Sequence, residues 1–222
     1  MSQKHVIIVA GGTGSRMNST VPKQFLEVND KPILAHTIQK FLDYDKNIDI
    51  VIVSHKDFLN DVLSLLTKYF SGKNIKTCVG GAARFDSVRN GLELLKNEKG
   101  LVGIHDAARP MVSITTIKNA FDEAEKHGNG IPVIQMYESI RHTENGDSKA
   151  VNRTHFTIVQ TPQCFKLELI RKAFEQNYKE TFTDDATVLE SIGEKINLTQ
   201  GNPENIKITN PGDLLFAQAI LK

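Results

Sequence analysis

The sequence has little that would indicate a secreted, membrane-spanning or nucleic-acid-binding protein. Only two of its 222 residues are cysteines, Cys78 and Cys164, which are too few for a disulfide framework or a thiolate zinc site. The longest apolar stretches, around Val6–Ala10 and Ile50–Val53, fall far short of the ~20 residues that a membrane span needs. Lys and Arg number 27 against 26 Asp and Glu, and no run of like charges stands out. We therefore expect neither a membrane nor a duplex nucleic acid as a partner.

The amino-terminal residues and the composition favour an ordinary globular protein. Residues 1–5 lead directly into a strand-like run without a signal peptide, so we expect a cytoplasmic location. With 40% hydrophobic and 24% charged residues, the chain can bury a core, which excludes disorder of the whole. A chain of 222 residues fits one large domain or two small ones. No repeat, low-complexity tract or linker divides it, so we expect a single domain over residues 1–222.

Apolar strand-like runs alternate with helix-period segments through the first 135 residues. Strands are predicted at His5–Ala10, Ile48–Ser54, Ile75–Val79, Leu101–His105 and Gly130–Gln135. Helix-period segments lie between these strands, for example at Ile114–His127. Continuous apolar strands joined by short helical connections predict an α/β fold, in which a doubly wound, mostly parallel sheet carries helices on both faces.

The alternation breaks at Met136–His155. This stretch is polar and contains Asn145-Gly146, which is a strong signal for a tight turn. Its flanks, Ser139–Arg141 and Ala150–Asn152, could pair as a hairpin that protrudes from the body as a β-hairpin arm, and a flexible surface loop fits the residues equally well. The α/β pattern then resumes, with strands predicted at Phe156–Gln160, Ile196–Thr199 and Asn205–Ile208, and helices at Leu167–Tyr178, Asp184–Ile192 and from an Asn210 cap to Ile220.

A glycine-rich loop, Gly11–Arg16, follows the first predicted strand. Glycines at the carboxyl end of a strand allow a tight turn whose backbone N–H groups can face a phosphate. The loop is not a Walker loop, because no Gly-Lys pair stands at the required distance. It is not a dinucleotide fingerprint either, because Met17 occupies the third glycine position, which disfavours an NAD-dependent oxidoreductase. Arg16 and Lys23 lie just beyond the glycines and suit a polyphosphate, although a plain turn with two solvated cations would have the same residues.

A second candidate segment, His105–Pro110, lies at the predicted carboxyl end of the fourth strand. The Asp106 carboxylate could hold Mg²⁺ between phosphate oxygens, because Mg²⁺ needs few protein ligands. Arg109 could bind a second anion with two hydrogen bonds. The small Ala107 and Ala108 leave room for a ligand. An aspartate that caps the following turn and pairs with an arginine is the alternative interpretation of this segment.

Three further segments carry candidate residues. Gly80–Ser87 closes the third predicted strand and opens a helix, so its bare backbone, Arg84 and Ser87 could hydrogen-bond a base edge or an anion. Thr183 stands at a predicted helix start with acidic residues in the first turn, where a structural capping role is favoured. Lys207 lies inside a predicted apolar strand, where a lysine needs an anionic partner.

Taken together, these segments resemble the nucleotide-binding signature of nucleotidyltransferases with a glycosyltransferase-A-like fold. The matching segments are Ala10–Met17, Pro22–Gln24, His105–Pro110, Gln160–Gln163, Thr183–Ala186 and Asn205–Thr209. From about residue 5 to its end the chain resembles the 2-C-methyl-D-erythritol 4-phosphate cytidylyltransferase family of the non-mevalonate isoprenoid pathway. Ribitol-5-phosphate cytidylyltransferases share the first motif and Thr-Pro-Gln and stay an alternative, as does a non-catalytic nucleotide-binding module.

This resemblance implies CTP and a polyol phosphate as substrates and Mg²⁺ as cofactor. The nucleotide would be bound by Ala10, Gly11, Gly12, Thr13, Gly14, Gly81, Ser87 and Ala107. The catalytic cations on the triphosphate would be Arg16, Lys23 and Lys207, and Asp106 would hold the metal. The sugar phosphate would be bound by Asp106, Arg109, Ser139, Thr161, Thr183 and Arg153. The resemblance also implies a homodimer in which the arm, residues 136–155, crosses to the second subunit, so that Arg153 completes the second subunit's site.

Two positions depart from the family pattern. Ser139 stands where the family usually has a threonine, so the hydroxyl is kept. Ala82 stands where some members carry an acid beside the cytosine.

The implied chemistry fits the remaining residues, because a phosphate-monoester oxygen is already anionic near neutral pH and needs no general base. The candidate sites offer cations for the crowded transition state and no base.

Overall fold

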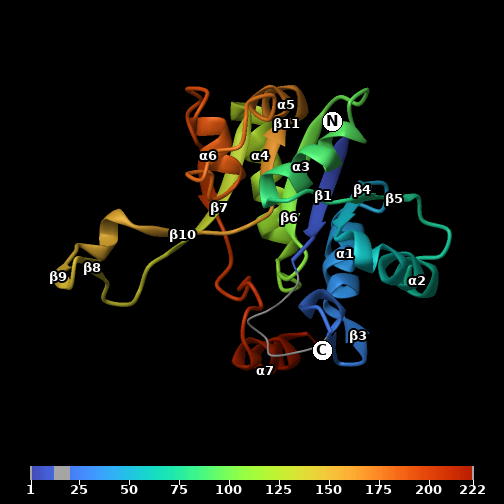
Figure 1. The fold of residues 1–222 in the computed structure, drawn as a ribbon, viewed down its shortest axis with the longest axis horizontal. Helices are drawn as coiled ribbons and strands as arrows, with labels where there is room; N and C mark the ends of the chain where they lie inside the picture. The colour runs from blue at the N-terminus through green and yellow to red at the C-terminus, as the bar shows by residue number, and fades with distance from the viewer. Residues whose placement is uncertain (1, 13–20, 222) are drawn as a thin grey trace.

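The structure is a computed structural model that describes residues 2–12 and 21–221. Three predicted site residues of the glycine-rich loop, Thr13, Gly14 and Arg16, lie outside the described residues. The described chain forms an eight-stranded central sheet with the order β10-β7-β11-β6-β1-β4-β5, and β12 pairs with β7 beside this path (Figure 1). The strands are β1 Lys4–Ala10, β4 Asp49–Ser54, β5 Ile75–Val79, β6 Leu101–Asp106, β7 Asn129–Gln135, β10 Thr157–Val159, β11 Gln163–Lys166 and β12 Leu198–Gln200.

The sheet is mostly parallel, as the sequence predicts. Strands β5, β4, β1 and β6 pair in parallel, and β12 runs parallel to β7. Strand β11 lies antiparallel between β6 and β7, and β10 runs antiparallel along β7. The sequence analysis missed β11, a four-residue strand in which only Cys164 and Phe165 are apolar. Its position matters, because it brings the preceding segment Gln160–Pro162 beside the carboxyl end of β6.

Helices cover both faces of the sheet, which confirms the doubly wound arrangement. The helices are α1 Ile33–Tyr44, α2 Leu59–Tyr69, α3 Arg84–Glu93, α4 Ile114–His127, α5 Leu167–Ala173, α6 Asp185–Glu190 and α7 Pro211–Ile220. Alternating residues of β1 point to opposite faces. Val6 and Ile8 pack in the core with residues of α1, α2 and α4, whereas Ile7 packs with residues of α3, α5 and α6.

Helix ends follow local sequence signals. The Ser113 side chain accepts a hydrogen bond from the Thr116 N–H at the start of α4, and the helix ends at Gly128, whose φ of 94° favours glycine. Asn210 caps α7 as predicted, accepting from the Asp213 N–H. Helices α5 and α6 are shorter than predicted, ending at Ala173 and Glu190.

The predicted strand at Asn205–Ile208 is wrong. This segment has no regular secondary structure and pairs with no strand among the described residues. Its polar groups bond to loops instead, because the Ile208 N–H donates to the Ala108 oxygen and Asn205 Nδ2 donates to the Thr161 oxygen. The segment therefore lies against the loops at the end of the sheet, where its side chains can reach a site.

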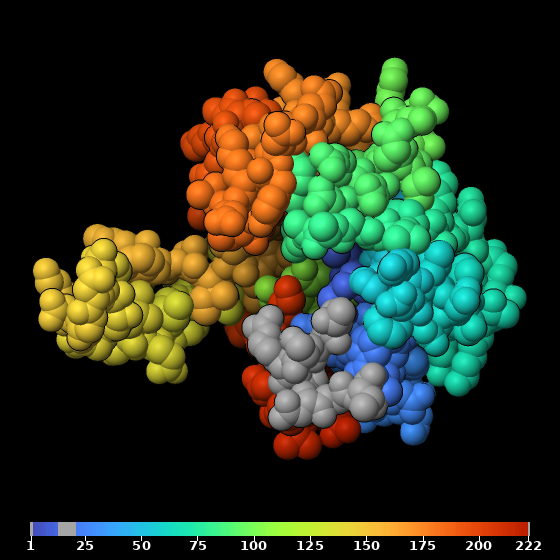
Figure 2. All heavy atoms as spheres, viewed as in Figure 1, coloured from blue at the N-terminus to red at the C-terminus, as the bar shows by residue number. Residues whose placement is uncertain are grey.

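The polar insertion forms a hairpin, with β8 Arg141–Glu144 antiparallel to β9 Asp147–Ala150. Asn145 and Gly146 make the turn with φ values of 49° and 86°, so the predicted β-hairpin is confirmed. Every residue of both strands is exposed, and Figures 1 and 2 show the hairpin standing off the body as an arm. Across residues 2–12 and 21–221, no helix has the length and apolar character required to cross a membrane.

Candidate active site

Two cavities open at the carboxyl edge of the parallel strands, where ligands bind in sheets of this type. The first has a volume of about 600 Å³ and is lined by the ends of β1 and β6 and by the turn before α3. The second, of about 310 Å³, is lined by the segment before β11 and the residues before α6. Arg84, Asp106 and Lys207 line both cavities and so form a shared wall.

The sequence-predicted residues divide between these two cavities. The first cavity holds Ala10, Gly11, Gly12, Lys23, Gly81, Ser87, Asp106, Ala107 and Lys207. The second holds Asp106, Arg109, Thr161, Thr183 and Lys207. The structure thus brings predicted residues that lie far apart in the chain to one edge of the sheet.

The turn before α3 presents bare backbone to the first cavity. A Cβ added to Gly81 would lie 2.2 Å from the Asp86 Cβ, so only glycine fits this turn. Ser87, which is 4% exposed, holds the turn closed by accepting from the Gly81 N–H at 3.2 Å and donating to the Ala83 oxygen at 3.1 Å. Asp86 accepts from the Ala83 N–H at 3.1 Å. The Ser87 hydroxyl thus shapes the cavity wall.

Two consecutive residues attach the η2 turn, Lys23–Phe25, to the site. The buried Gln24 side chain donates from Nε2 to the Ala10 oxygen at 2.9 Å, which fixes the end of β1. Lys23 donates from Nζ to the Ile208 oxygen at 3.0 Å. These bonds join the segment after the glycine loop to both the sheet and the carboxyl-terminal segment.

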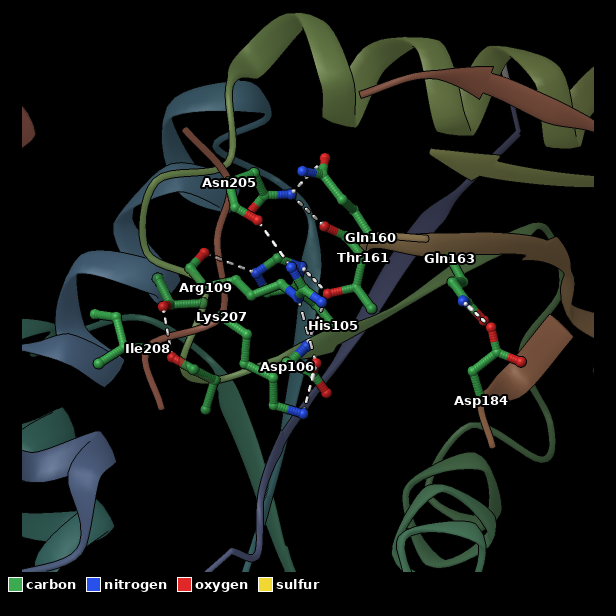
Figure 3. Close-up of polar contacts among 12 residues, drawn as sticks. His105, Asp106, Arg109, Gln160, Thr161, Gln163, Asp184, Asn205, Lys207 and Ile208 are labelled. Carbon is green, nitrogen blue, oxygen red and sulfur yellow. Dashed lines mark hydrogen bonds and ion pairs between the residues drawn. The ribbon is translucent and has the colours of Figure 1, made fainter. Parts of the chain in front are cut away.

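Asp106 lies at the centre of three cations. Its Oδ2 is 3.0 Å from Lys207 Nζ and 3.4 Å from Arg109 Nε (Figure 3). Its Oδ1 is 3.5 Å from Arg84 Nε. Although burial disfavours the ionised form, Arg84, Lys207 and Arg109 hold the pKa of Asp106 well below its usual range. The anionic partner that the sequence demands for Lys207 is therefore Asp106.

Two contacts fix the position of the Arg109 side chain. Besides its pairing with Asp106, it donates from Nη1 to the Asn205 backbone oxygen at 2.8 Å. Asn205 is fully buried, and its Nδ2 donates to the Thr161 oxygen at 2.8 Å. Burial lowers the pKa of Arg109, and the Asp106 carboxylate opposes this shift. The Arg109 guanidinium thus bridges the carboxyl-terminal segment and the end of β6.

His105, which the sequence analysis gave no role, organises the wall between the loops. Its ring is fully buried, with Nε2 3.1 Å from the Arg109 oxygen and Nδ1 3.0 Å from Thr161 Oγ1. Since a carbonyl can only accept, Nε2 carries the proton and the Thr161 hydroxyl donates to Nδ1. The same hydroxyl accepts from the Asp106 N–H at 3.1 Å. Burial lowers the pKa of His105 to about 4, so the ring is neutral at pH 7.

The segment before α6 differs from the prediction in one respect. Asp184 is the N-cap of α6, accepting from the Thr187 N–H at 2.9 Å, so Thr183 is not the cap. Thr183 is exposed and lines the second cavity. Gln163 connects this segment to β11, because its Nε2 donates to Asp184 Oδ2 at 2.8 Å (Figure 3). Its Oε1 accepts from the Ala186 N–H, also at 2.8 Å.

Two predicted residues lie away from both cavities. Ser139 and Arg153 are exposed on the arm, and neither is among the described residues that line either cavity. Arg153 donates from Nη1 to the Tyr137 backbone oxygen. Within one chain the arm therefore contributes no residue to the described site.

The described residues contain no group of three or more His, Cys, Asp or Glu side chains that could hold a metal by themselves. Asp106 is the one carboxylate among the described residues that line the first cavity. A single carboxylate at a cavity rich in cations fits a metal that arrives with substrate phosphates better than a metal held by a protein cage.

The chain matches the family model described as 2-C-methyl-D-erythritol 4-phosphate cytidylyltransferase over residues 4–222. The chain belongs to this family. It is similar to the 2-C-methyl-D-erythritol 4-phosphate cytidylyltransferase of Bacteroides thetaiotaomicron, with 43% identity over 99% of this chain and 100% of that protein. It is also similar to that of Clostridium botulinum strain Okra, with 39% identity over 100% of this chain and 99% of that protein.

Solved structures of this cytidylyltransferase family share the fold. The 4-diphosphocytidyl-2C-methyl-D-erythritol synthase of Anaerococcus prevotii matches with a TM-score of 0.84 and 28% identity, covering 99% of this chain and 98% of that chain. The Francisella tularensis 2-C-methyl-D-erythritol 4-phosphate cytidylyltransferase matches with a TM-score of 0.80 and 33% identity, covering 98% and 99%. The predicted family, α/β nucleotidyltransferase fold and transferase class are therefore confirmed.

Proposed function

We propose that this cytidylyltransferase joins CTP to 2-C-methyl-D-erythritol 4-phosphate, giving 4-diphosphocytidyl-2-C-methyl-D-erythritol and pyrophosphate in isoprenoid precursor biosynthesis. The observation that carries the proposal is the wall of Arg84, Asp106 and Lys207 that the two cavities share. A reaction that joins two phosphorylated substrates needs two adjoining sites, with cations where the phosphates meet.

The first cavity suits the nucleotide. Its lining offers the bare backbone of Gly81 and the small Ala107 for the cytidine, and Lys23 and Lys207 for the phosphates. Arg16 has the same proposed role and lies outside the described residues. The second cavity, with Arg109, suits a compact anionic substrate such as a polyol phosphate.

The proposed chemistry depends on positioning and charge. The attacking phosphate oxygen is already anionic near neutral pH, so no residue has to remove a proton. Attack on the α-phosphorus in line with the departing pyrophosphate brings negative charges together. The cations Lys23 and Lys207, with Arg16, would stabilise the charge that develops on the phosphate oxygens.

A divalent cation is part of the proposal. Asp106 would be its protein ligand, and bound Mg²⁺ would neutralise charge on the phosphate oxygens. Asp106 stays ionised because of its three cationic neighbours, so it needs no deprotonation before it can bind a metal. The substrate phosphates would take over the pairing of Lys207 and Arg109 as they enter the site.

The homodimer through the arm is also part of the proposal. Apolar side chains at the base of the arm are exposed, including Tyr137 at 67%, Phe156 at 47% and Ile158 at 39%. A two-stranded ribbon is marginally stable alone, and an exposed apolar edge favours association with a second subunit. Arg153 and Ser139 would then reach the second subunit's sugar-phosphate site.

We further propose one domain over residues 1–222, and the cytoplasmic location stays a prediction.

The experiment is pyrophosphate release from CTP and Mg²⁺ with each sugar phosphate in turn. We expect turnover with 2-C-methyl-D-erythritol 4-phosphate. Turnover with ribitol 5-phosphate alone would make the chain a ribitol-5-phosphate cytidylyltransferase in activity. The absence of turnover with either sugar phosphate would favour a non-catalytic nucleotide-binding protein.

A further inference from the structure

Arg84 is a cation of the site to which the proposed function assigns no substrate group. It is the first residue of α3, directly after the glycine turn of the first cavity. It lines both cavities, and its side chain is 30% exposed, so part of the guanidinium can reach a ligand. Among the described residues, Asp106 and Lys207 are the others that line both cavities.

A buried carboxylate fixes the direction of this guanidinium. Arg84 Nη1 and Nη2 donate to Asp185 Oδ1 and Oδ2 at 2.8 Å and 2.7 Å, a bidentate pair. Asp185 is fully buried, and a buried carboxylate is costly unless it is paired. The fork-on-fork geometry restricts the guanidinium to one orientation, which a lysine could not reproduce.

The pair with Asp185 does not use all the hydrogen-bond donors of Arg84, a residue that lines both cavities. A guanidinium has five N–H donors, and the pair with Asp185 uses two. Nε lies 3.5 Å from Asp106 Oδ1, which is an ion-pair contact too long for a strong hydrogen bond. Although burial disfavours its charged form, the carboxylates of Asp185 and Asp106 raise the pKa of Arg84, so it stays charged.

The position of Asp185 relates the pair to the second cavity. Asp185 begins α6, and the two residues before it, Thr183 and Asp184, line the second cavity and not the first. The Arg84 guanidinium is thus held from the side of the cavity that suits the polyol phosphate. The first cavity already has Lys23 for the nucleotide phosphates.

We propose that Arg84, oriented by Asp185, is a further substrate-binding residue that donates hydrogen bonds to the phosphate monoester of the second substrate at the shared wall. Asp185 is its positioning residue. The inference rests on the proposed function, because the phosphates of the two substrates have to meet where the cavities adjoin. It assigns the monoester one cation from α3 in addition to Arg109.

The test compares single and double variants by steady-state kinetics and thermal unfolding. Arg84→Gln alone would leave Asp185 unpaired, so the key protein is Arg84→Gln/Asp185→Asn, in which two amides replace the two buried charges. We expect this variant to fold, with KM for the polyol phosphate raised about 10- to 100-fold, as for a lost hydrogen bond to a charged group, and KM for CTP unchanged. Arg84→Lys keeps the positive charge but cannot form the bidentate pair, so its KM for the polyol phosphate should stay above that of the parent.

The matched control is Arg89→Gln. Arg89 lies on the same helix in an exposed ion pair with Asp86 at 2.7 Å and lines neither cavity, so both KM values should stay at the parent level. A folded double variant with the parent's KM for the polyol phosphate would mean that the pair is structural only. A rise in the KM for CTP of equal size would assign Arg84 to the nucleotide and overturn the inference.

A binding measurement separates this inference from the proposed function. Calorimetry with inorganic phosphate compares the parent with the double variant and requires no turnover. If the parent transfers cytidylyl groups to neither sugar phosphate, the proposed function fails, whereas weaker phosphate binding by the double variant still supports Arg84 as a phosphate ligand. Equal phosphate binding by the two proteins overturns the inference about Arg84.

Discussion

The Lys207 ammonium lies 3.0 Å from Oδ2 of Asp106, so a residue of the carboxyl-terminal segment pairs with the end of the central strand β6. This contact lies on the boundary between the two cavities. Arg109 and Arg84 also lie close to the Asp106 carboxylate. Asp106 therefore neutralises part of the positive charge that would bind the substrate phosphates. The predictions below test the residues around this ion pair.

Replacement of Lys23 by alanine should lower kcat more than it weakens CTP binding. Charge on the phosphate oxygens grows towards the transition state, so the ammonium contributes more there than in the ground state. Loss of one well-placed cation typically costs about 10²–10³-fold in kcat. The control is Lys56→Ala, since Lys56 is exposed nearby and lines neither cavity. A kcat within a few-fold of the parent would show that Lys23 has no catalytic role.

Replacement of Gly81 by alanine should destabilise the turn before α3 and weaken CTP binding. The new Cβ would lie 2.2 Å from the Asp86 Cβ, so the turn has to shift. We expect a loss of about 1–3 kcal/mol in the free energy of unfolding, measured in urea, and a higher KM for CTP. Gly11→Ala is the control for stability, because its Cβ would make an ordinary contact, 3.6 Å from Ser87 Oγ. Equal stability of the two variants would contradict the prediction.

The free energy of unfolding should fall as the pH is lowered from 6.5 towards 4, because of His105. Burial lowers the pKa of His105 from 6.5 to about 4, so between these values the unfolded chain binds a proton that the folded chain does not. The loss summed over this range is about 3 kcal/mol and is complete near pH 4. Asp106 also contributes stability that is lost on acidification, because its cationic neighbours lower its pKa, but this loss occurs only at lower pH.

The measurement is urea unfolding at several pH values for the parent and for His105→Gln. Glutamine can still donate to the Arg109 oxygen but takes up no proton. The variant lacks the buried ring, so it should be less stable at pH 7. Because it takes up no proton at this position, its free energy of unfolding should depend less on pH between 6.5 and 4. Equal slopes for the two proteins would mean that His105 is not the titrating group.

The shared site of the proposed homodimer can be tested by mixing two inactive proteins. Arg153→Ala would remove the arm's contribution, and Asp106→Asn would remove the carboxylate at the shared cavity wall. In a two-fold dimer with crossing arms, co-refolded heterodimers have one intact site and should regain up to about half the activity per dimer. Heterodimers that form but remain inactive would show that Arg153 acts within its own subunit or not at all.

The sequence by itself determined the parts of this protein that local physics controls. Continuous apolar runs specified the parallel strands and helix-period spacing specified α1 to α4. Asn145-Gly146 located the turn of the arm, although a surface loop fitted the same residues. Glycines and cations after strands predicted which loops form the site, because the carboxyl ends of parallel strands meet at one edge. Gly81, Asp106 and Arg109 could be placed at this edge for this reason, whereas Lys207 was selected as a lysine that needs an anionic partner.

Only the tertiary structure decided the rest. Strand β11 is short and weakly apolar and exists because β6 and β7 lie on either side of it, whereas Asn205–Ile208 looks like a strand but has its polar groups satisfied by loops. The pairing of Arg84 with Asp185 and the bond of His105 to Thr161 join residues that are remote in sequence. Such contacts depend on long-range packing, which no local pattern encodes, and they determine which donors face the cavities.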